Sequence, residues 1–406
     1  MAKNKLKRIN EFMKRNKSFC PAAFHEIYAD NSGRYRLCCH ARPIPEFKNM
    51  DFKEEKHLPF DYFLSDAMEE VRQKMLEGET IPACKTCYSI EKKSPDGSSY
   101  RTKMFEKHGM NTEVNRVNLK VRFFGNYCNL SCYMCHPFNS TSRGKELKEI
   151  FPKSNKEDYD NFIAKQLAND EGINIKYSDW DNYFNHILEN IDLIRTFQMM
   201  GGETLQLPKY WEMLDRIPKD KAKNIRVSAQ TNLTEIRYKN FSVFDTADKF
   251  EQLTLGASVD HYGDKLSFMR YPIDPQVFEN NLQEIIDGGV RYSLDLTVSI
   301  LNIDELDEIR KYYKDKFSIP EHINLHFSNV VRGPEYLSIR NLPQRMKDRY
   351  LEKYHDLTYV VAELREEPNQ PVDKFIAYCD KLWLHRGGTD WKILWKDFLD
   401  DLHQQR

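Results

Sequence analysis

In the stretch Val121-Arg-Phe-Phe-Gly-Asn-Tyr-Cys-Asn-Leu-Ser-Cys-Tyr-Met-Cys135, three cysteines follow an apolar, strand-like segment. Cys128, Cys132 and Cys135 have the spacing CxxxCxxC. Three thiolates are one short of the four that close a structural zinc site or saturate a four-iron cluster. On a four-iron cluster, the missing ligand leaves one iron open to another molecule. A zinc ribbon that takes a distant fourth ligand, such as His136, is the alternative that the same spacing allows.

A second apolar segment ends in a glycine pair and a carboxylate, in Phe197-Gln-Met-Met-Gly-Gly-Glu203. Glycine lets a ligand approach the backbone closely and a carboxylate complements a cation, although Gly-Gly after a strand is also a common turn. In this order, the two segments resemble the leading motifs of the radical S-adenosylmethionine (SAM) superfamily. The resemblance implies that the three cysteines hold a 4Fe-4S cluster whose open iron binds SAM. It also implies that Gly201, Gly202 and Glu203 receive the SAM ammonium group.

Four further positions follow from the same resemblance. Asn232 ends the third predicted strand in Gln-Thr-Asn, although Leu233 replaces the glycine that usually follows in the family. Ser258 and Arg270 match the serine and arginine that contact the SAM ribose and carboxylate, and Val331 matches a position near the adenine. A serine at a strand end is often only a local cap, and a single arginine is often part of a surface ion pair.

Strand-like and helix-length segments alternate from Asn118 onward. The candidate strands are Leu119 to Phe124, Thr196 to Met200, Ile225 to Ala229, Gln252 to Val259, Tyr292 to Ile300 and Ile323 to Phe327. The alternation predicts parallel strands with helical crossovers in an α/β fold. By resemblance, residues 113–335 are expected to form a partial (β/α)6 TIM-like barrel, with its site at the carboxyl ends of the strands. Residues 336–406 are expected to form a helical C-terminal extension.

A second group of cysteines lies in the first ninety residues. Cys20 and Cys38 flank a segment whose alternation and Asp-Asn-Ser-Gly turn predict a β-hairpin. Cys84 and Cys87 form a CxxC, the commonest way to present two thiolates to one metal. Cys39 leaves an ambiguity, because adjacent residues of a strand point to opposite faces and only one of the pair is expected to be a ligand.

This second group resembles the auxiliary 4Fe-4S cluster of the twitch and SPASM families, which implies that Cys20, Cys38, Cys84 and Cys87 hold an additional cluster. Family spacing from Gly33 selects Cys38. The module precedes the triplet here, at residues 1–112, whereas those families usually carry it after the barrel. Uncharacterised phage and bacterial proteins with such an N-terminal module show the same overall arrangement. A four-thiolate zinc site would use the same residues.

Composition excludes some function classes. Lys plus Arg is 61 and Asp plus Glu is 62 in 406 residues, so the net charge of -1 gives no reason to expect nucleic acid or an acidic membrane as a partner. The chain has no run of eighteen apolar residues and no signal-peptide core. Nine cysteines without a secretory signal favour metal or redox roles over disulfides. We therefore expect a cytoplasmic protein.

The resemblance implies a radical SAM enzyme that reductively cleaves SAM to a 5'-deoxyadenosyl radical and abstracts hydrogen from a substrate. A peptide or protein side chain is the expected substrate, because twitch and SPASM relatives often act on these, and a flavodoxin or ferredoxin is the expected reductant. Dehydrogenation of a small molecule and a zinc-binding scaffold are the alternatives. No catalytic acid or base is assigned, since Asp260, His261, Asp295 and Asn302 near strand ends are typical of structural roles.

Overall fold

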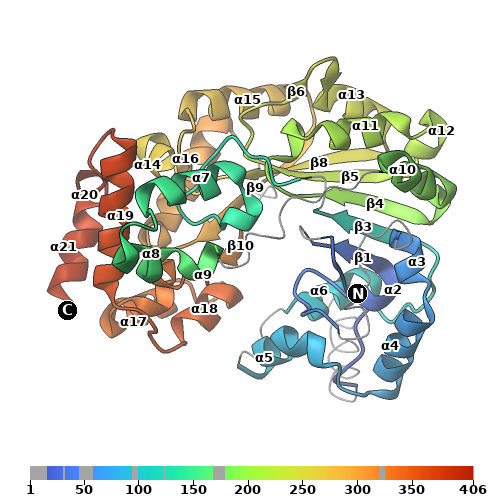
Figure 1. The fold of residues 1–406 in the computed structure, drawn as a ribbon, viewed down its shortest axis with the longest axis horizontal. Coiled ribbons are helices and arrows are strands. Elements are labelled where there is room, and N and C mark those ends of the chain that lie inside the picture. The colour runs from blue at the N-terminus through green and yellow to red at the C-terminus, as the bar shows by residue number, and fades with distance from the viewer. Residues whose placement is uncertain are drawn as a thin grey trace.

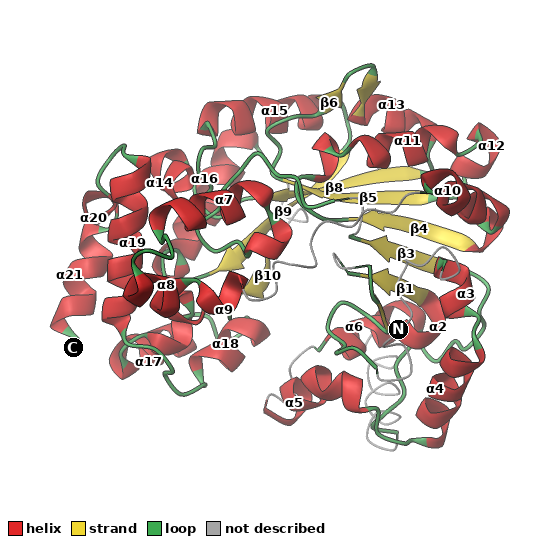
Figure 2. Cartoon of the chain, in the orientation of Figure 1, coloured by secondary structure: helices red, strands yellow, loops and turns green. Residues whose placement is uncertain are grey.

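An eight-stranded, mostly parallel sheet forms the centre of the protein (Figures 1 and 2). The computed structural model describes residues 16–30, 33–44, 58–93, 99–122, 125–167, 179–319 and 325–405. The strands follow the order β10-β9-β8-β5-β4-β3-β1-β2. Their bounds are β1 (Glu26–Ala29), β2 (Tyr35–Arg36), β3 (Val117–Val121), β4 (Ile194–Met199), β5 (Arg226–Thr231), β8 (Gln252–Ser258), β9 (Arg291–Val298) and β10 (Leu325–Val330).

The six predicted strands of the barrel are present as β3, β4, β5, β8, β9 and β10, and each is parallel to its neighbours. Residues 123–124 and 323–324 of the predicted strands lie outside the described residues. Spatial order follows chain order, as expected for successive strand-helix-strand units. Among the described strands, β10 and β2 are the two edges, so the structure confirms a mixed α/β fold with an open sheet and does not show a closed barrel.

The N-terminal hairpin is present as β1 and β2 and continues the main sheet, but residues 22–25 of the expected first strand form α2, and residues 31–32 of the predicted turn lie outside the described residues. Ala29 of β1 pairs with Tyr35 of the antiparallel strand β2, and on its other side Ile27 pairs with Leu119 of the parallel strand β3. A parallel pair needs a long connection, and here the two strands are about ninety residues apart in the chain. The carboxyl end of β1 therefore lies beside the end of β3, which leads to Cys128.

Helices surround the sheet and occupy the intervals that the sequence predicts (Figure 1). The N-terminal helices are α2 (Ala22–His25), α3 (Pro59–Phe63), α4 (Asp66–Glu77), α5 (Lys85–Lys93) and α6 (Tyr100–His108). Between β3 and β10 lie α7 (Thr141–Ile150), α8 (Lys156–Phe162), α9 (Ala164–Leu167), α10 (Trp180–Glu189), α11 (Pro208–Arg216), α12 (Lys219–Ala222), α13 (Val243–Lys249), α14 (Gly263–Met269), α15 (Pro275–Asp287) and α16 (Leu306–Phe317). A short ribbon, β6 (Arg237–Tyr238) and β7 (Phe241–Ser242), precedes α13.

The C-terminal extension consists of α17 (Gln344–Lys353), α18 (Thr358–Leu364), α19 (Val372–Arg386), α20 (Trp391–Leu394) and α21 (Lys396–Gln404). In Figure 1 these helices lie together with α7, α8 and α9 at the end of the molecule opposite the N-terminal helices. Their apolar residues are buried, including Trp391 and Trp395, which are at most 1% exposed. No helix in the described part of the chain is long and apolar enough to cross a bilayer.

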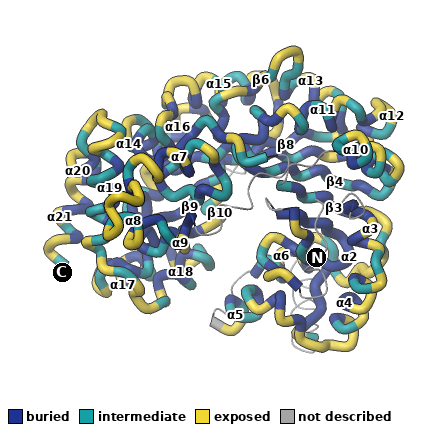
Figure 3. The backbone as a smooth tube through the Cα atoms, viewed as in Figure 1, coloured by how far each residue is buried: buried dark blue, intermediate teal, exposed yellow. Residues whose placement is uncertain are grey.

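The two faces of the sheet differ in polarity. On β5, Val227 and Ala229 are buried, whereas Ser228 and Gln230 on the opposite face are half-buried. Figure 3 shows buried, dark blue residues together with half-buried, teal residues along the central strands. A parallel sheet with helices tightly packed on both faces carries apolar residues on both. The alternation on β5 therefore indicates that one face lines an interior space with polar side chains.

Candidate active site

The cysteine triplet lies in a loop that follows β3 at its carboxyl end. Cys128 is buried, and Cys132 and Cys135 are half-buried. The loop is fixed by backbone hydrogen bonds to the chain after α14: Ser131 N donates to Tyr271 O (2.6 Å) and Tyr133 N donates to Met269 O (2.8 Å). The three thiols are thus held on backbone that is paired to another part of the fold.

The glycine pair after β4 lies directly beneath this loop. Both glycines have positive φ angles, 132° for Gly201 and 43° for Gly202, which side chains rarely adopt. A Cβ at Gly202 would stand 1.9 Å from Tyr127 O, and one at Gly201 would stand 2.8 Å from Gly125 O. The pair is therefore required by the close approach of the cysteine loop, which differs from the expected reason, the approach of a ligand.

Glu203 connects the ends of three strands. Its backbone N donates to Tyr127 O in the cysteine loop (2.7 Å). Its carboxylate accepts hydrogen bonds from Thr231 Oγ1 (2.6 Å) and Asn232 N (2.6 Å) at the end of β5, and from Leu205 N (3.2 Å). Burial raises the pKa of Glu203 to about 7, although these three donors favour the ionised form. A cation beside this carboxylate would offset the cost of its burial.

Asn232 and Arg270 each reach one thiol of the triplet. Asn232 Nδ2 lies 3.9 Å from Cys128 Sγ, and Arg270 Nη1 lies 3.8 Å from Cys132 Sγ. Arg270 is held by an ion contact of 2.7 Å between its Nε and Asp260 Oδ2, without hydrogen-bond geometry. The Asp260 carboxylate, followed by the thiols of Cys132 and Cys135, raises the pKa of Arg270 against the opposing effect of burial. The guanidinium therefore stays charged next to the thiols.

The thiols of the triplet have the chemistry of ligands for a soft cation. Burial, and secondarily the Cys132 thiolate, raises the pKa of Cys128 and raises that of Cys135 to about 12. Leu130 N donates to Cys128 Sγ at 3.4 Å. Thiolates that repel one another in a buried loop are neutralised by binding a metal. The three thiols are the donor type that binds an iron-sulfur cluster. Among the described residues, no three His, Cys, Asp or Glu side chains converge on one metal position.

Ser258 and Val331 lie at the same edge of the sheet but farther along it. Ser258 ends β8 and pairs with Asp295 of β9. Val331 follows β10 and its N donates to Val298 O at the end of β9 (2.8 Å). Within the described part of the chain, no hydrogen bond or ion pair joins either residue to the triplet. Their roles remain predictions.

The C-terminal helix α19 holds the cysteine loop from the other side. Arg386 is bound to Glu146 of α7 through Nε (2.6 Å) and Nη2 (2.8 Å), and it also donates to Phe268 O (2.7 Å) and to Ser131 O. Burial alone would raise the pKa of Glu146, but Arg386 and Arg143 lower it to about 2. Sequence reasoning missed this ionic cluster, because no motif links residues so far apart in the chain.

The four N-terminal cysteines that were predicted as ligands are all buried, whereas Cys39 is exposed. Burial, followed by the Cys84 thiolate, raises the pKa of Cys20, and Cys20 in turn contributes to the raised pKa of Cys38. Burial also raises the pKa of Cys87, while the backbone N–H groups of residues 100 and 101, at the start of α6, lower it. These effects place Cys20 within electrostatic range of Cys84 and Cys38, whereas no three of the described thiols converge on one metal position, so the choice of Cys38 over Cys39 stays a prediction.

A buried ionic cluster lies between β1, β3 and α6, and sequence reasoning also missed it. Lys120 Nζ lies 2.9 Å from Glu26 Oε2, and Tyr100 OH donates to the same oxygen at 2.5 Å. The ring of His40, close to Cys38, stacks on Tyr100 with a centroid distance of 5.1 Å. In the register of the two strands, Glu26 pairs with Asn118 and Tyr28 pairs with Lys120, so Glu26 and Lys120 lie diagonally across the parallel pair. Only the parallel pairing of β1 with β3 brings them together.

The polar residues near strand ends that received no catalytic role make structural contacts; they are Asp260, His261, Asp295 and Asn302. Asp260 holds Arg270, as described above, and His261 Nε2 contacts Glu305 Oε2 at 3.0 Å. Asp295 accepts a hydrogen bond from Gln230 Nε2 (2.5 Å), and Asn302 Nδ2 donates to Asp260 O (3.1 Å). The expectation of structural roles therefore agrees with the contacts, and no catalytic acid or base is assigned.

The pKa of Glu203 leads to a testable expectation for stability. A carboxyl whose pKa rises from its ordinary value to about 7 on folding contributes stability that is complete below the ordinary value and is lost as the pH rises through 7. When the pH is raised from 4.5 to 8, the unfolding free energy of the unmodified protein should therefore decrease by about 3 kcal/mol more than that of Glu203→Gln. Urea unfolding of the metal-free protein at both pH values measures it.

Glu352→Gln, which changes an exposed side chain on α17, is the control for this experiment. It should leave the unfolding free energy within about 0.5 kcal/mol of the unmodified protein at each pH. Parallel pH profiles for the unmodified protein and Glu203→Gln would contradict the expected titration.

Comparison with known proteins gives distant structural likenesses only. No family model matches the chain, and no curated protein matches it. The solved structure of native anSMEcpe with bound AdoMet shares 16% identity and a TM-score of 0.36, over 59% of each chain. The complex of anSMEcpe with AdoMet and Kp18Cys peptide shares 17% identity and a TM-score of 0.36, over 60% of each chain. Streptococcus suis SuiB bound to S-adenosylmethionine shares 14% identity and a TM-score of 0.37, over 74% of this chain and 60% of that one. The chain thus spans about three fifths of the length of each.

Proposed function

We propose that this chain is a radical SAM enzyme that cleaves SAM reductively and abstracts hydrogen from a peptide or protein side chain. The observation that carries the proposal is the arrangement around the cysteine loop. Three thiols follow β3, and the ends of β4 and β5 meet them through Gly202, Glu203 and Asn232. Arg270 reaches them from the end of α14. These groups lie at the carboxyl edge of a parallel sheet, where such folds place their ligands.

The residues have distinct roles in this proposal. Cys128, Cys132 and Cys135 would hold a 4Fe-4S cluster, which supplies one electron to SAM bound at its open iron and so generates a carbon radical. Glu203 offers a buried negative charge to the SAM ammonium group, and Arg270 offers a positive charge to its carboxylate. Ser258 and Val331 are proposed contacts for the ribose and adenine. The C-terminal helices and α7 pack over the loop and bury the side chains of Arg386 and Tyr133, and this packing limits the access of water to the loop.

The N-terminal cysteines are proposed to hold a second, four-thiolate 4Fe-4S cluster within residues 1–112. Four buried thiols support this, since a complete thiolate set leaves no open iron. The four-thiolate cluster would therefore transfer electrons or anchor the substrate, whereas the cluster on the triplet, with its open iron, would start the reaction by cleaving SAM. A peptide or protein substrate is proposed on the resemblance of these cysteine modules to the twitch and SPASM families, and a flavodoxin or ferredoxin is proposed as the reductant.

Metal content tests the proposal directly. Protein purified without oxygen should be brown and contain about eight irons per chain, because two four-iron clusters are proposed. On reduction in the presence of SAM it should release 5'-deoxyadenosine. Elemental analysis and chromatography measure the two results. Stoichiometric zinc without iron after anaerobic reconstitution would overturn the proposal in favour of a zinc-binding scaffold.

A further inference from the structure

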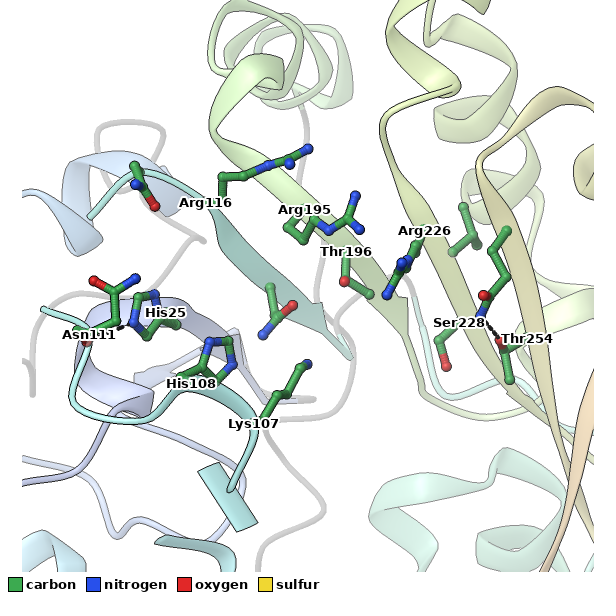
Figure 4. A pocket seen from close by; sticks show the side chains of 14 residues that line it. His25, Lys107, His108, Asn111, Arg116, Arg195, Thr196, Arg226, Ser228 and Thr254 are labelled. Carbon is green, nitrogen blue, oxygen red and sulfur yellow. Dashed lines mark hydrogen bonds between the residues drawn. The ribbon is translucent and has the colours of Figure 1, made fainter. Parts of the chain in front are cut away.

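A cavity of about 590 Å³ opens at the amino ends of the strands, at the opposite edge of the sheet from the cysteine triplet. Figure 4 shows the side chains that line it. Arg195 and Thr196 of β4, Arg226 of β5 and Thr254 of β8 form one wall, and Lys107 and His108 of α6 face them. The volume is in the range of pockets that bind small molecules.

The lining of this cavity is strongly cationic. Lys107, Arg116, Arg195 and Arg226 line it, and none of the described lining residues is a carboxylate. Glu251, outside the lining, pairs with both Arg195 and Arg226 (2.9 Å to Arg226). Four cations against this one carboxylate leave an excess of three positive charges (4 − 1 = 3). A concave site with a charge excess of one sign attracts the opposite charge.

The cationic groups also affect one another. Lys107 is exposed at the edge of the cavity, but partial desolvation by the surrounding protein lowers its pKa, the neighbouring charges of Lys120, Arg226 and Arg195 lower it further, and Glu26 opposes them. No hydrogen bond or ion pair of the Lys107 ammonium is formed among the described residues. Like charges gathered around one cavity oppose folding unless a ligand neutralises them. The arrangement is therefore that of a site whose counter-charge comes from outside the chain.

Polar groups on both walls offer further hydrogen bonds. His25 Nε2 is 2.8 Å from Asn111 O, and its ring stacks on His108 with a centroid distance of 4.4 Å. His108 Nε2 is a buried atom with no hydrogen-bond partner in the described structure. The hydroxyls of Thr196, Ser228 and Thr254 face the same space from the sheet. An oxyanion accepts hydrogen bonds from donors of all these kinds.

We infer that this cavity binds a small oxyanion-bearing ligand, a phosphate or carboxylate compound, between α6 and the amino ends of β4, β5 and β8. The site is separate from the proposed chemistry. Five residues of extended chain, from Thr196 to Gly201, span roughly 16 Å. A radical formed beside the triplet does not reach the cavity, so the ligand is an effector or the remote end of an extended substrate. The inference uses none of the cysteines and does not depend on the proposed function.

Titration calorimetry of the full chain tests this inference, with inorganic pyrophosphate and citrate as separate probes at about 0.15 M salt, where weak surface charge effects are screened. At least one probe should bind saturably with one site per chain. Tighter binding of pyrophosphate indicates a phosphoryl ligand, and tighter binding of citrate indicates a carboxylate ligand. Lys107→Gln should weaken binding about tenfold, equivalent to about 1.4 kcal/mol, because it removes a charge that forms no ion pair with any described residue.

Lys103→Gln is the matched control, since Lys103 is exposed on the same helix, one turn before Lys107, and does not line the cavity. It should leave the affinity unchanged. Absence of saturable binding of both probes up to about 5 mM would overturn the inference. So would an equal loss of affinity in Lys103→Gln and Lys107→Gln, which would indicate attraction by the whole surface. Loss of 5'-deoxyadenosine production alone does not bear on this site.

Discussion

Replacement of Cys128, Cys132 and Cys135 by alanine will abolish release of 5'-deoxyadenosine from SAM, down to the level of a protein-free reaction. The three thiolates are the only protein attachments proposed for the cluster with the open iron, so its loss removes the electron donor. Iron should fall from about eight to about four per chain, because the second cluster has its own ligands. Chromatography after anaerobic reduction and iron analysis on the same sample measure both effects.

Two matched variants separate this effect from a general loss of cysteines. Cys84→Ala with Cys87→Ala should also lose about four irons but retain SAM cleavage that is uncoupled from product formation. Cys379→Ala removes a buried thiol of α19 that belongs to neither group and should retain both clusters. Full SAM cleavage by the triple variant would contradict the assignment. Complete loss of cleavage in a folded Cys84/Cys87 variant would contradict the separate roles of the two clusters.

Arg386→Met will destabilise the protein by about 3–5 kcal/mol. Arg386 is the centre of a buried cluster, with two hydrogen bonds to Glu146 and two to backbone carbonyls of the segments around the cysteine loop. Removal of Arg386 deletes one of the two cations that compensate the buried Glu146 carboxylate, the other being Arg143, and it also removes the donor to two backbone carbonyls. Urea unfolding of the metal-free protein at neutral pH measures the change in unfolding free energy.

Arg365→Met is the control for this substitution, because Arg365 is exposed at the end of α18. It should change the unfolding free energy by less than about 0.5 kcal/mol. The double variant Arg386→Met with Glu146→Gln should be no more stable than Arg386→Met, because it leaves the buried Arg143 guanidinium without its carboxylate partner. If Arg386→Met were as stable as Arg365→Met, the proposed support of the cysteine loop by the C-terminal helix would be wrong.

Local sequence signals predicted the elements of the fold well, because those signals are physically local. The strands β4, β5, β8 and β9 each cover most of a predicted segment, and α4 ends at Gly78, where φ is 84°. A helix commonly ends at a residue with positive φ, which glycine adopts without strain. The helical character expected after residue 336 is present in α17 to α21, and α17 and α18 are separated by a break at residues 354–357.

The candidate site was predictable only in part. The triplet and the Gly-Gly-Glu segment could be recognised because their spacing is a property of a short stretch of chain. The contacts that surround them could not. Glu203 meets Thr231 and Asn232, and Arg270 meets Cys132, only because the carboxyl ends of neighbouring parallel strands gather at one edge. Nor did the sequence indicate that Gly202 is required by Tyr127 O and Gly201 by the carbonyl oxygens of Arg122 and Gly125.

By itself, the sequence determined six of the parallel strands of the central sheet, the two groups of cysteines and the number of thiols in the triplet. Hydrophobic periodicity, turn residues and thiol spacing are encoded over a few residues. Only the tertiary structure decided that β1 pairs with β3, that Arg386 supports the cysteine loop and that cations from β4, β5 and α6 share one cavity. These arrangements depend on packing between residues that lie far apart in the chain, and no local pattern records such distances.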